Sequence, residues 1–406
     1  MTRFVILTQF YPPEVGAAQI RLAAFASALQ QRGHEVQVVT AMPNYPSGRV
    51  QDGYRRRLRV REEVDGIPVE RAWIYPATGS GKLKRVASYC SFAASSVPAL
   101  MRIRSADVLF VESPPLFLGG TALLASALRR QRLCVNISDL WPDSVVAIGL
   151  MGEDSVLIRV ARRLERVLYR RAWKISVVTD EMRETLITDH GIPREKVQFL
   201  PNGVDVKFFA PQLRDEALLQ QLGLVGKAVF AYTGLHGYAQ GLDVILGAAE
   251  FLRDRLDIAL LFVGDGPEKA RVVHEAAIRG LDNVFFLDLQ PVSAMPRIFS
   301  IVTASIVPLL DRPLFSGARP SKIFPALACA TPVVFCGKGE TARIIEGARC
   351  GVVVPPEDPR ALAEAIVALA DDPARVATLG ATGRAFVEEH YSWTTIVDRW
   401  LEDITL

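Results

Sequence analysis

Two carboxylates lie close together in the segment 138–144, Ser-Asp-Leu-Trp-Pro-Asp-Ser, which follows a strand-like run at Leu133–Ile137. Two carboxylates, a tryptophan and a proline are unusual choices for a plain turn. If this segment lies near a reacting carbon, Asp139 or Asp143 could orient a hydroxyl group or accept its proton. The alternative is that Asp143 or Ser144 caps the following helix, because both residue types accept hydrogen bonds from helix N-terminal amides.

Glycine-containing loops follow three other strand-like runs and precede predicted helices. They span residues 11–18, 232–243 and 264–268, and their glycines are Gly16, then Gly234, Gly237 and Gly241, then Gly264 and Gly266. Glycines at such junctions let backbone amides and a helix N-terminus approach a phosphate closely. Each loop alone could equally be an ordinary strand-to-helix turn. None has the Gly-x-Gly-x-x-Gly spacing of dinucleotide-binding folds, which argues against a dehydrogenase.

A further predicted helix opens with Arg319-Pro320-Ser321-Lys322, which brings two cations to another strand end. Two cations there suit a diphosphate, although they could instead form a solvated face. The five histidines form neither a His-x-x-x-His pair nor a cluster with cysteine, so the sequence predicts no metal site. The Gly-x-Ser-x-Gly and P-loop motifs are also missing, which argues against serine hydrolases and P-loop enzymes.

Strand-like and helical runs alternate along both halves of the chain, and these elements must position the residues above. In the first half, strand-like runs lie at 4–8, 36–40, 69–73, 108–111, 133–137 and 175–178. The alternation restarts after Asn202-Gly203, with runs at 229–233, 259–263, 284–287, 304–308, 332–335 and 351–354. Short strands separated by helices indicate parallel sheets. The sequence therefore predicts an α/β fold with two doubly wound, Rossmann-like domains, residues 1–202 and 203–384. We expect them to face each other across a cleft, with ligands at the carboxyl ends of the strands.

The composition is that of a folded protein without a strong charge bias. The chain has 406 residues, half of them apolar, and 47 Lys and Arg against 44 Asp and Glu leave a net charge of +3. This excludes disordered, collagen-like and coiled-coil chains and gives no reason to expect a nucleic-acid partner. Five cysteines without a Cys-x-x-Cys pair suggest a reducing cytosol. The longest uncharged stretches, 86–101 and 114–128, are shorter than a membrane-spanning helix needs.

One predicted helix, at 159–171, is both basic and amphipathic. Arg159, Arg162, Arg163, Arg166 and Arg170 follow helical spacing, and Val160, Leu164, Val167 and Leu168 cover the other side. Such a helix can lie against anionic lipid. Lys82, Lys84 and Arg85 add positive charge beside the apolar run 86–101. The alternative is a surface helix whose apolar side simply packs on the sheet.

Considered in their order along the chain, these segments resemble the family-4 retaining glycosyltransferases of the GT-B fold. The resemblance rests on 9–18, 42–46 (Met-Pro-Asn-Tyr-Pro), 139–144, 201–205 (Pro-Asn-Gly-Val-Asp), 234–243, 264–269 and 320–324. It covers nearly the whole chain and is closest to the bacterial branch of O-antigen, capsule and colanic-acid transferases, which includes N-acetyl-L-fucosamine transferases. In such folds the last helix, here at about 385–406, packs back on the N-terminal domain.

The resemblance implies a site in which the C-terminal domain binds a nucleotide-diphosphate sugar and the N-terminal domain holds the acceptor. It implies transfer with retention of the anomeric configuration and without a metal ion or other cofactor. Lys322 would neutralise the leaving diphosphate, and Asp139 and Asp143 would lie near the reacting sugar. The donor-side residues would be Gly16, Gly234, His236, Gly237, Gln240, Gly264, Gly266, Arg319, Ser321, Lys322 and Glu340, and the acceptor-side residues Asn44, Tyr45 and Trp141.

The sequence departs from the family pattern at two places. Many relatives carry an arginine and a lysine in the glycine-rich loop, where this chain has Leu235 and Gln240. The family's acidic pair would fall at Gly317 and Pro325, and neither is acidic. The second acidic residue of that pair normally binds the nucleotide ribose, and Glu340 is the substitute that we expect for it.

These observations predict a glycosyltransferase that moves a sugar from a UDP donor to a polyprenyl-diphosphate-linked or other saccharide, with an N-acetylated hexosamine as one option for the sugar. It would act in O-antigen, lipopolysaccharide or exopolysaccharide assembly. We expect it in the cytoplasm, held peripherally on the inner face of the cytoplasmic membrane through 159–171 and 82–85. Two alternatives remain open: a UDP-sugar 2-epimerase of the same architecture, and a catalytically silent glycosyltransferase-like subunit, which the missing acidic pair would explain.

Overall fold

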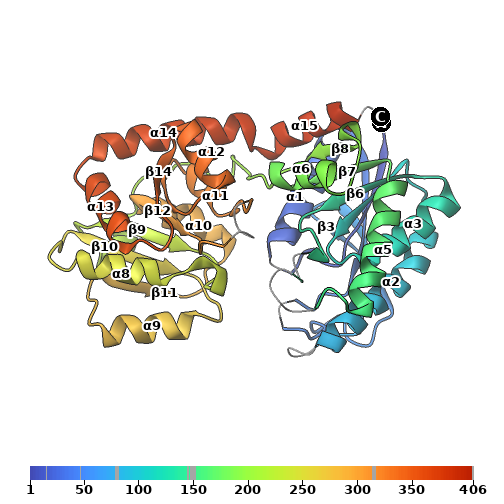
Figure 1. Ribbon diagram of the computed structural model, residues 1–406, viewed down its shortest axis with the longest axis horizontal. Helices are drawn as coiled ribbons and strands as arrows, with labels where there is room; N and C mark the ends of the chain where they lie inside the picture. The colour runs from blue at the N-terminus through green and yellow to red at the C-terminus, as the bar shows by residue number, and fades with distance from the viewer. Residues whose placement is uncertain are drawn as a thin grey trace. The chain divides into compact units, whose positions relative to one another are not determined.

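The computed structural model describes residues 1–14, 16–45, 47–77, 82–143, 146, 152–312 and 317–404. The chain divides into two compact units. Unit 1 comprises Met1–Asn202 together with Ile396–Leu406, and unit 2 comprises Gly203–Thr395. Each unit is built on one largely parallel sheet with helices packed against it (Figure 1). The predicted α/β class with two Rossmann-like sheets is therefore confirmed.

Unit 1 contains an eight-stranded sheet. Its strands, in spatial order, are β3 (Arg59–Val64), β4 (Ile67–Ala72), β2 (Glu35–Ala41), β1 (Arg3–Leu7), β5 (Val108–Ser113), β6 (Arg132–Ile137), β7 (Lys174–Val177) and β8 (Val197–Phe199). All neighbours pair in parallel except β3 and β4, which form an antiparallel hairpin. The strand-like runs expected from the sequence include neither edge strand of this sheet. Strand β3 alternates exposed and half-buried residues and has no apolar run, and β8 is only three residues long.

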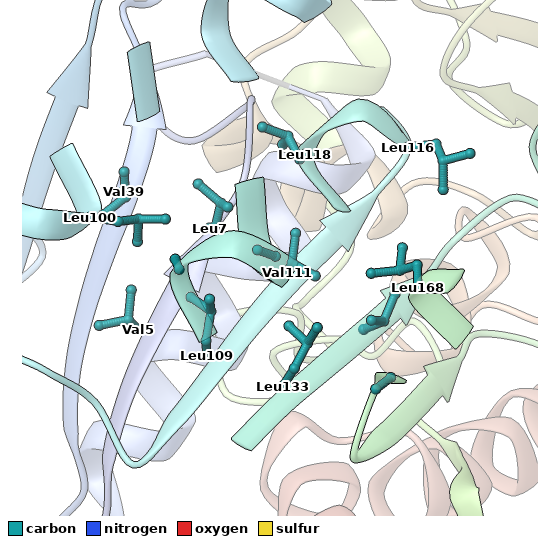
Figure 2. Packing of buried hydrophobic residues seen from close by; sticks show 14 of the residues in the cluster. Val5, Leu7, Val39, Leu100, Leu109, Val111, Leu116, Leu118, Leu133 and Leu168 are labelled. Carbon is teal, nitrogen blue, oxygen red and sulfur yellow. The ribbon is translucent and has the colours of Figure 1, made fainter. Parts of the chain in front are cut away.

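Helices α2 (Lys82–Arg102), α3 (Phe117–Arg129) and α5 (Val156–Arg171) lie side by side on one face of this sheet. Figure 2 shows the core that they form with the strands. It includes Leu100 of α2, Leu118 of α3 and Leu168 of α5, packed with Leu7 and Leu109, and none of these side chains is more than 3% exposed. The basic helix α5 therefore packs one side on the rest of unit 1, with Ile158, Ala161 and Leu168 buried. The apolar side expected from the sequence is only partly correct, because Val160 and Val167 are exposed and Leu164 is half-buried.

The opposite face of the sheet carries α1 (Ala17–Gln31) and the end of the chain, α15 (Trp393–Ile404). Trp400 is fully buried, with its ring centroid 6.1, 5.1 and 5.9 Å from those of Phe4, Phe25 and Phe110. Its indole Nε1 donates a hydrogen bond of 2.8 Å to Ser176 Oγ. These contacts explain why residues from 396 onward belong to unit 1. Helix α6 (Asp180–Thr188) also belongs to unit 1.

Unit 2 contains a six-stranded parallel sheet. Its strands, in spatial order, are β11 (Val284–Leu287), β10 (Ile258–Val263), β9 (Ala228–Thr233), β12 (Ala304–Pro308), β13 (Val333–Cys336) and β14 (Gly351–Val354). Its α-helices are α7 (Glu216–Leu222), α8 (Asp243–Phe251), α9 (Lys269–Ile278), α10 (Met295–Phe299), α11 (Ile323–Ala328), α12 (Glu340–Ala348), α13 (Pro359–Ala370) and α14 (Pro373–His390). Two apolar cores lie within the unit, one of them around Phe230, Phe262 and Ile306 and the other around Val229, Leu261 and Ile301.

Each sheet has one point where the strand order reverses. In unit 1 this point lies between β1 and β5, and in unit 2 between β9 and β12. The connections that leave two such strands run to opposite sides, so a crevice opens at their carboxyl ends and ligands bind there in open α/β sheets. The loops after these four strands are therefore the first place to look for a site. None of the helices in the described part of the chain combines the length and apolar character that crossing a bilayer requires.

Candidate active site

Two glycine-containing loops of unit 2 are bonded to each other at the carboxyl edge of the sheet. The His236 amide donates to the Asp265 carbonyl (2.9 Å), and the Glu268 amide donates to the His236 carbonyl (3.0 Å). A Cβ atom would lie 2.0 Å from the Gly234 carbonyl oxygen if placed at Gly264, and 2.4 Å from the His236 carbonyl oxygen if placed at Gly266. These glycines are therefore required by the packing of one loop on the other.

His236 lies in the interior of this loop pair. Its ring centroid is 5.3 Å from that of Tyr232 and 6.0 Å from that of Phe262, and the residue is fully buried. Burial lowers the pKa of His236, and Lys269 and Lys322 lower it further. Neither ring nitrogen has a hydrogen-bond partner in the part of the chain that the structure describes. Since buried polar groups usually carry a partner, His236 remains a candidate for contact with a bound donor.

Lys322 lies at the reversal point of unit 2. Its Nζ donates a hydrogen bond of 2.7 Å to Tyr232 Oη and sits 3.9 Å from the centroid of the same ring. The Tyr232 hydroxyl in turn donates to the Leu235 carbonyl. A Cβ atom at Gly234 would be 3.4 Å from Nζ, so the glycine leaves the ammonium adjacent to the loop backbone. Burial lowers the pKa of Lys322 to about 7.

Arg319 and Glu340 form an ion pair between two buried side chains. The Arg319 guanidinium also lies 5.6 Å from the centroid of the Tyr391 ring, which stacks on Phe324 at 4.4 Å. The two residues to which the sequence assigns separate roles, at the diphosphate and at the ribose, are thus bound to each other. Glu340 is the first residue of α12 and follows β13.

The other residues of unit 2 that were expected on the donor side lie in turns and short helices. Gln240 ends a short 3₁₀ turn, Tyr238–Gln240, and Gly237 precedes that turn. Ser321 is exposed in the turn before α11. Gly317 lies in a turn and Pro325 lies inside α11, so neither position of the family's acidic pair supplies a carboxylate.

In unit 1, Gly16 is the N-cap residue of α1, which follows β1 at the reversal point. Among the described residues, no side chain caps this helix, and its first turn contains no acidic residue. The positive end of the helix dipole is therefore not compensated from within α1.

A buried carboxylate that the sequence analysis did not single out lies beside this helix. Glu112, in β5, forms an ion pair with Arg21 of α1 and accepts hydrogen bonds from Asn136 Nδ2 (2.7 Å) and Ser138 Oγ (2.8 Å). The cluster joins α1, β5 and β6 at the reversal point of the sheet. A single charge at the end of the apolar run Val-Leu-Phe-Val-Glu-Ser is the signal that could have revealed it.

The segment after β6 separates its two carboxylates. Asp143 Oδ1 accepts a hydrogen bond of 3.1 Å from Arg162 of α5, and His190 Nε2 lies 4.0 Å from its other oxygen. Trp141 packs edge-on against Phe117, with centroids 5.7 Å apart. Asp143 is therefore tied to α5, whereas Asp139 lies directly after the strand and Ser138. Ser144, the alternative helix cap, is outside the described residues.

The acceptor-side loop after β2 is held by Glu14. One oxygen of this buried carboxylate accepts from the amides of Asn44 (2.6 Å) and Tyr45 (2.7 Å). Burial raises the pKa of Glu14, and these hydrogen bonds oppose the rise. The Asn44 side chain is buried and donates to the Met42 carbonyl, whereas Tyr45 is exposed. Tyr45 is therefore the residue of this loop that an acceptor could touch.

The predicted residues thus form two groups. Gly16, Asn44, Tyr45, Asp139, Trp141 and Asp143 lie in unit 1, and the others lie in unit 2. Within the described residues, no group of three or more His, Cys, Asp or Glu side chains is placed to hold a metal ion.

The chain matches two protein families in succession. Residues 16–203 match the glycosyl transferase 4-like domain, and residues 227–372 match the glycosyl transferases group 1 domain. Over 338 residues the chain is 30% identical to WcaI of Escherichia coli (strain K12), named as a colanic acid biosynthesis glycosyl transferase, and the match covers 82% of each protein. Over 301 residues it is 28% identical to the glycosyltransferase WbjE of Pseudomonas aeruginosa, covering 73% of this chain and 74% of WbjE.

A solved structure has the same architecture over its full length. Anabaena Alr3699/HepE in complex with UDP and glucose matches with a TM-score of 0.74 and 18% identity, covering 100% of both chains. Three findings point to the same family: the two parallel sheets, the order of the two matched domains, and the 30% identity to WcaI. The chain therefore belongs to the glycosyltransferases of the GT-B fold, with a glycosyl transferase 4-like domain followed by a group 1 domain.

Proposed function

We propose that the protein transfers a sugar from a UDP-sugar to a polyprenyl-diphosphate-linked saccharide during assembly of a cell-surface polysaccharide. Transfer would retain the anomeric configuration and need no metal ion. The observation that carries the proposal is the position of the Lys322 ammonium, held by Tyr232 beside the Gly234 loop at the reversal point of unit 2. A largely buried cation at this edge is suited to a diphosphate.

In this mechanism Lys322 acts on the leaving group. As the bond between the anomeric carbon and the diphosphate lengthens, negative charge builds on the diphosphate oxygens. A lysine whose charged form is disfavoured by burial gains most from an arriving anion, so its interaction strengthens as that charge develops. Tyr232 keeps Nζ in place through the hydrogen bond and the ring contact. No metal ion is required for this step.

On the acceptor side, Asp139 is the residue that we propose to orient the attacking hydroxyl group. It follows β6 directly, next to Ser138 and the buried Glu112 cluster. Asp143 is bonded to Arg162, so its proposed role is to hold the segment on α5. Tyr45 and Trp141 would line the acceptor, because both belong to loops at the carboxyl edge of the unit 1 sheet.

The comparisons support the choice of donor and pathway. HepE is described in complex with UDP and glucose, and WcaI is named for colanic acid biosynthesis. A role in polysaccharide assembly follows from the name of WcaI, and UDP is the donor that we would test first. An N-acetylated hexosamine is the sugar that we would test first, as the sequence resemblance implies.

The exposed face of α5 supports contact with the cytoplasmic face of a membrane. Val156, Val160 and Val167 are exposed and lie among the exposed Arg159, Arg163, Arg166 and Arg170. Apolar side chains flanked by cations are typical of helices that lie in a bilayer interface containing anionic lipid. Lys84 and Arg85 at the start of α2 are exposed as well, and α2 covers the same face of the sheet.

The test is a transfer assay with the purified protein, a panel of UDP-, GDP- and ADP-sugars, and lipid-linked saccharide acceptors. We expect turnover with a UDP-sugar that depends strictly on the acceptor. Lys322→Ala should lower the rate roughly 100-fold or more, as loss of a group that stabilises transition-state charge does. The control Lys338→Ala removes an exposed lysine of unit 2 that is paired with Asp311, and should leave the rate within about twofold.

Each other outcome has a definite meaning. Turnover with a GDP-sugar would keep transfer but replace the donor. Conversion of a UDP-sugar without any acceptor would indicate 2-epimerisation instead. The absence of turnover for every pair, with a folded protein that binds no nucleotide, would overturn the proposal and favour a silent subunit.

A further inference from the structure

An arginine-rich pocket lies in unit 1, and none of the residues assigned above lines it. Its volume is about 390 Å³, and its walls include Arg49, Tyr54, Arg55, Arg56, Arg57 and Trp73. Six of the thirteen residues from Arg49 to Arg61 are arginine, and one is acidic. Met42, which also lines the pocket, begins the loop that carries Asn44 and Tyr45, so the pocket is continuous with the acceptor-side loop.

Most of the positive charge in this pocket is not neutralised by the protein. Arg55 pairs with Asp52 at 2.9 Å, and both side chains are exposed. For Arg49, Arg56 and Arg57, no carboxylate of the described residues lies within ion-pair distance, and all three are exposed. Several uncompensated guanidinium groups around one concavity attract an anion, and their planar forks suit phosphate oxygens.

The arginine loop is anchored to the unit 1 sheet. The Tyr54 hydroxyl donates to Glu62 of β3 (2.9 Å), and the Tyr54 ring lies 5.3 Å from the guanidinium carbon of Arg71 in β4. Arg71 is fully buried, and it donates to Glu62 and to the Ala41 carbonyl. The pocket is therefore built on the β3–β4 hairpin and its neighbouring strand, which would hold the guanidinium groups in place for a ligand.

A second pocket adjoins the first at Trp73. Its volume is about 460 Å³, and it is lined by Trp73, Tyr75, Lys84, Ala87 and Ser91. Trp73 and Tyr75 follow β4 and are 41% and 42% exposed, and the last three residues lie on α2. One compartment is thus cationic, the next is mainly aromatic and apolar, and an indole ring belongs to both.

We propose that these two pockets bind an isoprenyl diphosphate, with the arginines on the diphosphate and the Trp73–Tyr75 compartment on the first isoprenyl units. An amphiphile with two adjacent phosphates and an apolar chain would satisfy both compartments at once. Resting on the proposed function, this ligand is the lipid carrier of the acceptor. A membrane surface fits less well, because the arginines surround a concavity, whereas those of α5 lie on a convex helix face.

The experiment measures binding of farnesyl diphosphate to the full chain by calorimetry and by tryptophan fluorescence. Inorganic diphosphate and farnesol serve as the two halves of the ligand, and phosphatidylglycerol vesicles as the anionic surface. We expect farnesyl diphosphate to bind at least about tenfold more tightly than either half. The double variant Arg56→Ala/Arg57→Ala should lose roughly tenfold or more in affinity, since it removes charge-assisted contacts. Trp73→Ala should reduce the advantage of farnesyl diphosphate over inorganic diphosphate.

The matched control is Arg102→Ala/Arg104→Ala, which removes two exposed arginines at the far end of α2 and should change the affinity less than about twofold. Circular dichroism and thermal melting show that each variant is folded. The proposal is overturned if the wild-type protein does not bind farnesyl diphosphate. It is also overturned if Arg56→Ala/Arg57→Ala binds farnesyl diphosphate as tightly as the wild-type protein does. Loss of vesicle binding alone in this variant would assign the arginines to a membrane surface instead.

Transfer assays separate this inference from the proposed function. If farnesyl diphosphate binding depends on Arg56 and Arg57 but no saccharide is ever glycosylated, the proposed function fails and the isoprenyl diphosphate site stands. If lipid-linked saccharides are glycosylated and their KM is the same in Arg56→Ala/Arg57→Ala, the function stands and the site assignment fails. A KM raised roughly tenfold for lipid-linked acceptors, with a smaller change for acceptors lacking the diphosphate, supports both.

Discussion

The affinity for UDP is expected to fall as the pH rises from about 7 to about 9, because Lys322 binds a diphosphate in its charged form. Burial lowers the pKa of Lys322 from an ordinary 10.5 to about 7. This shift corresponds to about 5 kcal/mol that disfavours the ammonium in the unliganded protein. A diphosphate next to Nζ offsets this free energy and raises the pKa again. Each pH unit above the unliganded pKa should therefore weaken UDP binding by up to about tenfold.

The measurement is a calorimetric titration with UDP across this pH range, in two buffers of different ionisation enthalpy. The difference between the buffers reports how many protons the complex takes up, and we expect close to one per UDP at the upper end. The terminal phosphate of UDP titrates near pH 6, so it contributes little above pH 7. Lys322→Met keeps an unbranched side chain without charge, and should bind UDP more weakly and without this pH dependence.

The sign of the effect on stability follows from the same shift. Between pH about 7 and 10.5 the unfolded chain holds the Lys322 proton and the unliganded folded chain does not. The contribution of Lys322 to the free energy of unfolding therefore rises with pH in this window. A UDP affinity that is constant with pH and involves no proton uptake would show that Lys322 is already charged before UDP arrives. Equal binding by Lys322→Met would show that it does not contact the diphosphate.

Three further predictions concern the scaffold of the site. Glu112→Ala should lower the free energy of unfolding by about 3–5 kcal/mol in urea denaturation, because it leaves the buried Arg21 charge without its carboxylate; a loss below about 1 kcal/mol would contradict the importance of this pair. Gly266→Ala should weaken UDP binding and lower the melting temperature, because a Cβ atom would lie 2.4 Å from the His236 carbonyl oxygen. Gly280→Ala is its control, because Gly280 also has a positive φ (+59°) but no atom lies within 4 Å of the added Cβ. Equal losses of UDP affinity and of melting temperature in the two variants would refute the role of the contact at Gly266. Trp400→Ala should destabilise unit 1 by about 3–5 kcal/mol through loss of its ring contacts, and an unchanged melting curve would exclude this role of α15.

The residues assigned from the sequence differ in how far local patterns could describe them. Gly264 and Gly266 were recognisable as backbone positions that need glycine, but the atoms that a Cβ would meet there belong to another loop, which the sequence does not reveal. Arg319 and Glu340 were recognisable as charges at strand ends, but their mutual pairing joins residues on either side of β13. Lys322 was recognisable as a cation near a helix start, whereas nothing in the sequence pointed to Tyr232 as its partner.

The class of the fold and most of its strands follow from the sequence, because strand-like runs and helical spacing are local properties of neighbouring residues. The glycine-containing loops, the carboxylates after β6 and the cations before α11 could be placed at strand ends for the same reason. The chemistry of the site depends on contacts between distant positions. Lys322 and Tyr232 are 90 residues apart, Arg21 and Glu112 are 91 apart, and Trp400 and Ser176 are 224 apart. Such contacts determine which charges are buried, and burial is what lowers the pKa of Lys322, so the protonation of this group is a property of the folded chain.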